Sequence, residues 1–180
     1  METKKNIFEY WWEVLSKNYA NFNGRARRME FWSFTLVNFL IGVVLGFTNS
    51  IFIYFDIYYL TTILTTIYTL GVFIPGLAVG VRRFHDTGNP GWAPVTIGVV
   101  GLLFNLSSSI GRYIFSPSSF RGIDENLLII LIGGLGLIFV GLAIYVIVMY
   151  FVNGTYGPNK YGPDPKQPNL GNEIDEIGNE

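Results

Sequence analysis

Cysteine is absent from this chain of 180 residues, and charged residues are scarce, at 14%. The lack of cysteine excludes a disulfide framework, a thiol nucleophile and a cysteine-ligated metal site. Soluble domains contain roughly a quarter charged residues, whereas half of the residues here are hydrophobic and the mean hydropathy is positive. The composition therefore predicts an all-α integral membrane protein.

The chain also lacks an overall excess of positive charge, since its formal net charge is −1. Nucleic-acid binding needs clustered Lys and Arg, so we predict no nucleic-acid partner. It has one histidine, His85, which with a neighbouring Asp is too little for a metal site. We therefore predict no metal or cofactor. The N-terminal segment has no continuous apolar core, and we do not expect it to be a secretory signal peptide.

Long uncharged runs are present in four places, and a bilayer core needs about 20 apolar residues to be crossed. The first two runs are so close together that they should form a helical hairpin. The third is diluted by Asn105 and three serines at its end. We predict a bundle of four transmembrane helices, and a three-span alternative that omits the third run stays open. The predicted spans are about residues 31–53, 57–81, 92–110 and 127–152.

The orientation in the membrane is predicted from the distribution of Lys and Arg. Most of these residues precede the first span, follow the second or follow the fourth, whereas only Arg112 and Arg121 fall on the other side. Because positive charge stays on the cytoplasmic side, both termini should be cytoplasmic. The expected location is a bacterial plasma (inner) membrane, with multiple spans.

An amphipathic helix is predicted before the first span, over about residues 7–21. Its aromatic and aliphatic side chains recur at helical spacing, with charged residues between them, and this pattern is typical of a helix lying in the headgroup region. These side chains are Phe8, Trp11, Trp12, Leu15, Tyr19 and Phe22. Residues 1–166 should form one membrane domain, followed by an acidic, disordered tail over 167–180.

Glycines recur four residues apart in the spans, as at Gly42 and Gly46 or Gly76 and Gly80. Small residues at this spacing let helices approach closely, so a compact bundle is expected, and a homo-oligomer through these faces is the alternative. Pro75, inside the second span, removes a helical hydrogen bond and predicts a kink near Ile74.

Three polar stretches lie at the predicted cytoplasmic ends of the spans: "FNGRARRMEFW", "VRRFHDTGNPGW" and "GPNKYGPDP". Arginines at such places are typical of ordinary interfacial anchoring. Arg, His and Asp together can also form a hydrogen-bonded pocket for an anion such as a phosphate. The candidate site for an anion or partner consists of Arg25, Arg28, Glu30, Arg82, Arg83, His85, Asp86, Asn159, Tyr161 and Asp164.

The three stretches, in this order and separated by apolar spans, resemble the YhaH-like bacterial inner-membrane proteins of domain-of-unknown-function family 805. The resemblance runs from about Tyr10 to Pro165. The chain departs from the family pattern at Pro90, where serine is usual, and at Ala93, where a second aromatic is common. The resemblance implies matching positions at Phe22, Gly24, Arg25, Arg28, Glu30 and Trp32, at Arg82, Arg83, His85, Asp86, Gly88, Gly91 and Trp92, and at Asn159, Tyr161, Gly162, Asp164 and Pro165.

Three classes of function are compatible with these features. The first is a non-enzymatic membrane protein whose cytoplasmic face binds an anionic headgroup, a phosphorylated ligand or a partner protein. The second is a small transporter or channel subunit, although the spans contain no ionisable residue of the kind that marks such pathways; its pore would be lined by Thr61, Thr62, Thr65, Thr66 and Thr69. The third is a membrane enzyme with His85 as general base, oriented by Asp86 or Asp164.

Overall fold

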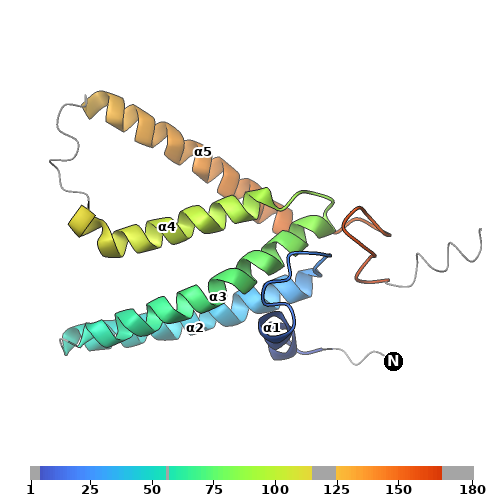
Figure 1. Cartoon of the computed structure of the whole chain (residues 1–180), viewed down its shortest axis with the longest axis horizontal. Coiled ribbons are helices and arrows are strands. Elements are labelled where there is room, and N and C mark those ends of the chain that lie inside the picture. The colour runs from blue at the N-terminus through green and yellow to red at the C-terminus, as the bar shows by residue number, and fades with distance from the viewer. Residues whose placement is uncertain (1–4, 56, 115–124, 168–180) are drawn as a thin grey trace, which may run out of the picture. The chain divides into compact units, whose positions relative to one another are not determined.

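The computed structural model describes residues 5–55, 57–114 and 125–167, and its regular elements are all helices (Figure 1). The predicted all-α class is confirmed. Contacts divide the chain into two units, one made of Met1–Gly91 with Asn153–Glu180 and the other of Trp92–Val152. The predicted tail lies almost wholly outside the described residues. The helices are α1 (Ile7–Ser16), α2 (Arg28–Tyr54), α3 (Tyr58–Asp86), α4 (Trp92–Ile114) and α5 (Glu125–Phe151).

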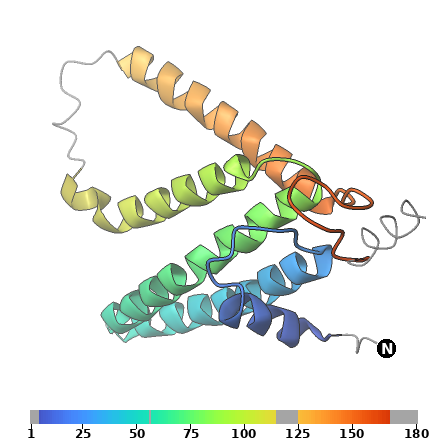
Figure 2. The same cartoon turned by 45° about the vertical axis from the view of Figure 1, so that its right-hand side comes forward.

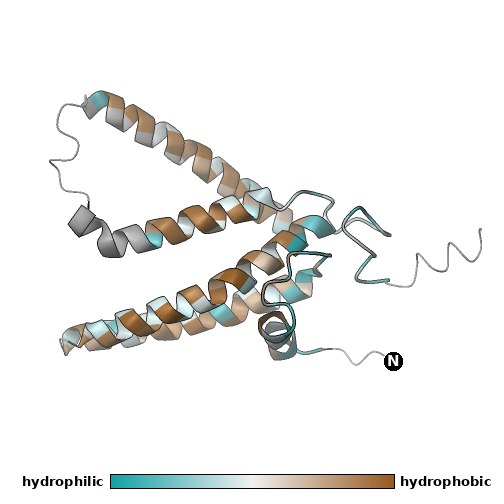
Figure 3. Cartoon of the chain, in the orientation of Figure 1, coloured by the Kyte–Doolittle hydropathy of each residue, from teal (hydrophilic) through white to brown (hydrophobic). Residues whose placement is uncertain are grey.

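Three of the described helices are long and apolar enough to cross a membrane: α2, α3 and the Gly133–Phe151 part of α5. The apolar part of α4, Trp92–Asn105, is shorter. Figure 3 shows hydrophobic residues along the middle of α2 and α3, with hydrophilic ones at the ends near residues 28 and 86. The fourth span and the orientation in the membrane stay predictions.

Helix α1 starts as the sequence predicts but ends earlier. Asn6 and Glu9 form a reciprocal capping box at its start. Its last residue is Ser16, not a residue near 21, so the prediction of a helix over 7–21 was too long. The reason is the asparagines that follow, since Asn18 and Asn21 hydrogen-bond to each other and favour turns over helix.

The first unit is built on the hairpin of α2 and α3, with α1 packed mainly on α2 (Figure 2). Two hydrogen bonds join the helices within their apolar regions. The Tyr68 hydroxyl donates to Asn38 Oδ1 and the Thr61 hydroxyl to Asn49 Oδ1, both at 2.6 Å. Such bonds stabilise helix pairs where lipid supplies no hydrophobic drive. Thr61, one of the threonines considered for a pore, is thus buried and bonded inside the hairpin.

Pro75 lies inside α3 and has no N–H to give to the carbonyl four residues earlier, which belongs to Gly71. The Tyr19 hydroxyl donates to that carbonyl at 2.8 Å. A side chain from the segment after α1 therefore supplies the hydrogen bond that the proline removes.

Helix α3 extends to Asp86, five residues past its predicted end, so "RRFHD" is helical and not part of a loop. A Schellman cap terminates it: Gly88, with φ of +77°, donates its N–H to the carbonyl of His85, and Asn89 donates to that of Phe84, at 3.0 and 3.1 Å. The arginines and histidine therefore project from a helix whose side-chain directions are fixed.

The second unit consists of α4 and α5, which contact each other over a short stretch. A Cβ built at Gly133, Gly134, Gly136 or Gly141 of α5 would meet no atom within 4 Å in the described chain. The same holds for Gly42 and Gly46 of α2. The close helix packing expected at these glycines is not formed by the described residues, and a homo-oligomer through them stays a prediction.

Candidate functional site

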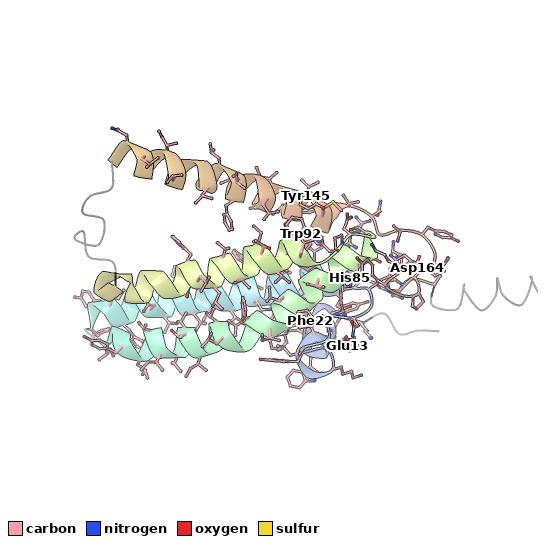
Figure 4. All side chains as sticks on the ribbon, turned by 45° about the horizontal axis from the view of Figure 1, so that its top comes forward. Glu13, Phe22, His85, Trp92, Tyr145 and Asp164 are labelled. Carbon is pink, nitrogen blue, oxygen red and sulfur yellow. The ribbon has the colours of Figure 1, made fainter. Side chains whose placement is uncertain are left out.

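The three polar stretches meet at one end of the α2–α3 hairpin, where Figure 4 shows His85 and Asp164. We call residues 24–30, 82–86 and 154–166 the polar cluster. Asn159 of the third stretch lies beside His85 of the second, since the Asn159 amide donates to the His85 carbonyl at 2.9 Å. Three segments that lie far apart in the sequence are thereby held together.

Asp86 is the centre of the polar cluster. Its Oδ1 accepts a hydrogen bond from Arg25 Nε at 3.0 Å and lies 2.9 Å from Arg25 Nη2, and its Oδ2 accepts one from Arg83 Nη1. The side chains of both arginines are at most 1% exposed. One buried carboxylate therefore pairs with two buried guanidinium groups, and all three groups are already engaged with one another.

Arg25 also binds the C-terminal segment. Its Nη1 donates to the carbonyl of Gly157 and its Nη2 to that of Thr155, each at 2.6 Å. Arg27, in the same stretch, donates to the carbonyl of Pro165. The two arginines thus fix the turns after α5 against the start of α2, since charged donors make the stronger hydrogen bonds.

The C-terminal end of α3 is covered by backbone and side-chain donors from the other two stretches. Thr155 N–H donates to the Asp86 carbonyl at 2.8 Å, and Ala26 N–H donates to that of Arg82 at 3.0 Å. The last carbonyls of a helix have no partner within it. The Thr155 contact supplies such a partner for Asp86, and the two contacts join the first and third stretches to α3.

His85 is held by two contacts that serve structure. Its Nδ1 lies 3.1 Å from the Gly24 carbonyl oxygen, and its ring stacks on that of Tyr161, with centroids 3.8 Å apart and planes 4° apart. Lys160 Nζ lies 4.9 Å from the centre of the same tyrosine ring. The histidine therefore links the first and third stretches through α3.

Neither carboxylate considered as a partner of His85 faces it. Asp86 binds the two arginines, and Asp164 accepts hydrogen bonds from the backbone N–H groups of Gly157 and Lys166 at 3.2 and 2.9 Å. The buried Asp164 thus shapes its own turn, as Asp commonly does. Among the described residues, no group of three or more His, Asp and Glu is placed to hold a metal ion.

Arg82 differs from the other buried arginines. Its Nη1 pairs with Glu30 Oε1 at 2.7 Å, and the residue is only 4% exposed. Its Nε and Nη2 have no hydrogen-bond partner in the described chain. These two N–H groups form the edge of a guanidinium that binds a carboxylate or a phosphate in a bidentate manner.

Arg28, the remaining predicted residue, lies in the first turn of α2, half-buried and close enough to Arg83 for the two charges to interact. Sequence reasoning placed Arg27 in the first stretch but not in the site. It placed Gly157 in the third stretch but not in the site, and it did not include Thr155. Both residues accept hydrogen bonds from Arg25 through backbone carbonyls, and a backbone contact leaves no residue-specific signal in the sequence.

The polar cluster is positively charged, although the whole chain has a slightly negative net charge. Residues 24–30, 82–86 and 154–166 contain seven Lys and Arg and three Asp and Glu, which is a net charge of +4, whereas the chain has −1. After the internal ion pairs are made, the cluster still has an excess of positive charge.

A family model described as "Protein of unknown function (DUF805)" matches residues 19–163, most of the chain. The chain belongs to that family. The match includes Tyr19 and most of the polar cluster and omits α1, so the contacts of Arg25, Arg82, His85 and Asp86 fall within the matched part, whereas those of Asp164, Pro165 and Lys166 lie just beyond it.

Two relatives of known name match almost the same length. Inner membrane protein YhaI of Escherichia coli (strain K12) is 32% identical over 87% of this chain and 95% of its own. Inner membrane protein YhaH of the same strain is 35% identical over 87% of this chain and 96% of its own. No solved structure matches the chain significantly. The names of these relatives and the apolar helices support a membrane location, and the family description leaves the activity open.

One substitution tests the packing of the polar cluster. A Cβ at Gly154 would lie 2.1 Å from Asp86 Oδ2, a buried atom already bonded to Arg83. We expect Gly154→Ala to lower the free energy of unfolding by about 1–3 kcal/mol, as overpacking does. Denaturant unfolding of the purified protein measures it. Gly42→Ala is the control, because nothing lies within 4 Å of that Cβ; equal stability of the two variants would contradict the packing described here.

Proposed function

We propose that this chain is a non-enzymatic, multi-pass inner-membrane protein whose polar cluster lies on the cytoplasmic side and binds a phosphate-bearing anion. Three membrane-length helices and the names of YhaI and YhaH support the membrane location. The excess of Lys and Arg in the polar cluster supports the orientation, because positive charge stays on the cytoplasmic side.

The proposal rests on Arg82, whose Nε and Nη2 form an edge that can donate two hydrogen bonds to one anion. A buried guanidinium with two unpaired N–H groups costs free energy, since each buried donor without an acceptor costs about 1–3 kcal/mol. A phosphate offers two oxygens at the spacing of that edge. An incoming anion would also meet the net charge of +4 of the cluster.

The depth of Arg82 in the membrane fits a phosphate. A hydrocarbon core is crossed by about 20 helical residues. We place one edge of the core where α2 and α3 meet in the hairpin, at Tyr54 and Tyr58. The other edge then lies near Thr35 of α2 and Leu77 of α3. Glu30 and Arg82 then each lie five residues beyond, about 7 Å at 1.5 Å per residue. The headgroup region is of similar thickness.

The contacts of His85 and the acidic residues support binding rather than catalysis. A general base must reach the proton that it removes. The His85 ring is stacked on Tyr161, and the carboxylates of Asp86 and Asp164 are committed to arginines and to backbone N–H groups. These groups are used to hold the three stretches together.

The proposal is tested by thermal unfolding of the protein in an uncharged detergent. Inorganic phosphate and phosphatidylglycerol are the probes, and phosphatidylcholine is the control lipid. A ligand that binds only the folded state raises its stability. We expect phosphatidylglycerol, phosphate or both to raise the Tm of the wild type; phosphate alone would indicate a soluble ligand and phosphatidylglycerol alone a lipid.

Arg82→Lys is the decisive variant. Lysine keeps the charge beside Glu30 but lacks the planar fork, so the variant should fold and bind the anion at least about tenfold more weakly. Lys17→Gln, which removes a basic residue outside the polar cluster, should bind as the wild type does. Equal Tm shifts in wild type and Arg82→Lys, or none with either probe, would contradict the proposal.

A further inference from the structure

We propose a second site, distinct from the polar cluster: the groove between α1 and α2 binds an acyl chain of a phospholipid, with the Trp11 indole N–H donating to an ester oxygen of that lipid. The inference concerns a face of the molecule that the anion site does not use.

The groove is lined by apolar side chains from both helices and has a volume of about 410 Å³. Ligand sites in proteins have volumes of roughly 300–1,000 Å³. Phe8, Leu40 and Val44 are each more than half exposed, whereas Val37 at the base is buried. The lining side chains include Phe8 and Trp11 of α1 and Val37, Leu40, Ile41 and Val44 of α2.

The indole N–H of Trp11 indicates which kind of molecule the groove binds. Its Nε1 is buried and has no hydrogen-bond partner in the described chain, although the ring lines an otherwise apolar groove. An indole N–H usually finds an acceptor when it is buried. A pure hydrocarbon surface, such as an apolar helix, would leave the donor unpaired. A glycerolipid has apolar chains and, at their upper end, ester oxygens that accept hydrogen bonds.

The position of the groove along α2 fits this occupant. Val37–Val44 begins two residues inside the expected edge of the hydrocarbon core near Thr35 and covers about 10 Å of it. Helix α1 has one apolar and one charged face, so it belongs at that edge. The upper part of an acyl chain and its ester lie at the same depth.

The test places a photoreactive diazirine analogue of leucine at position 40, in the full-length protein reconstituted into phosphatidylcholine vesicles. The protein is then extracted into detergent, washed and illuminated, and the adducts are mapped by mass spectrometry. Only retained lipid can react after the wash. We expect an adduct of phosphatidylcholine mass at position 40. The matched control is the same analogue at Leu64, an equally exposed position on α3 outside the groove, which should give none.

A second variant tests the indole N–H. Trp11→Phe keeps an aromatic ring in the groove and removes the donor, so the lipid adduct at position 40 should fall about three- to tenfold. Arg82→Lys should leave it unchanged, which separates failure of this site from failure of the anion site. Three results would overturn the inference. The first is an adduct with another helix or a second copy, the second is a lipid adduct that Trp11→Phe does not reduce, and the third is the absence of any lipid adduct.

Discussion

Replacing Asp86 with asparagine is expected to destabilise the protein by about 3–5 kcal/mol. The substitution removes the one carboxylate that Arg25 and Arg83 share, and both guanidinium groups are buried. Breaking a buried ion pair by removing one partner leaves an uncompensated buried charge, which accounts for a loss of this size. The third stretch should detach as well, because Arg25 also holds the carbonyls of Thr155 and Gly157. Denaturant unfolding measures the loss, and limited proteolysis after α5 reports the detachment.

Two further variants separate charge burial from other effects. Glu9→Gln is the matched control, since it makes the same change of acid to amide in an exposed capping box that accepts Gln equally well. It should be nearly neutral. Adding Arg83→Met to Asp86→Asn should recover part of the stability, because one of the two unpaired charges is removed. If Asp86→Asn is as stable as Glu9→Gln, the ion-pair arrangement described here is wrong.

Replacing Tyr19 with phenylalanine should cost about 1–3 kcal/mol, because it leaves the Gly71 carbonyl without a donor. Gly71 lies about 9 Å inside the expected edge near Leu77, where water is not available to replace the hydroxyl. The loss depends on Pro75. In the Pro75→Ala background, the N–H of residue 75 can donate to Gly71, and Tyr19→Phe should then cost little.

The four proteins of this double-mutant cycle give the coupling energy directly from denaturant unfolding. Tyr10→Phe is the control, since it removes a hydroxyl from α1 that has no such role in the described contacts. A coupling energy near zero would show that the tyrosine does not compensate the proline.

The sequence predicted the members of the polar cluster well, for a physical reason. Most Lys and Arg were expected on one side of the membrane, which grouped the three polar stretches, and the ends of a helical hairpin lie close together. Arg25, Arg82, His85 and Asn159 were selected in this way, and the structure places them in one cluster.

The sequence could not predict which charged side chains form ion pairs with one another. The enzyme alternative paired His85 with Asp86 or Asp164, yet the position of Asp86 on α3 directs it to Arg25 and to Arg83, three residues earlier on the same helix. The sequence also placed this segment in a loop after the second span, whereas α3 extends through it to the cap at Gly88. The role of Tyr19 was equally hidden, because its hydrogen bond reaches 52 residues along the chain to a backbone atom.

Native mass spectrometry of the protein released from native-membrane nanodiscs tests the central claim, that the polar cluster binds a phosphate-bearing anion through Arg82. Wild type is compared with Arg82→Lys, which keeps the ion pair with Glu30. The account predicts that the wild type retains a phosphorus-containing lipid or metabolite that the variant loses, and its mass would identify the ligand. Identical spectra from the two proteins would contradict it, and the polar cluster would then be a structural junction of three chain segments.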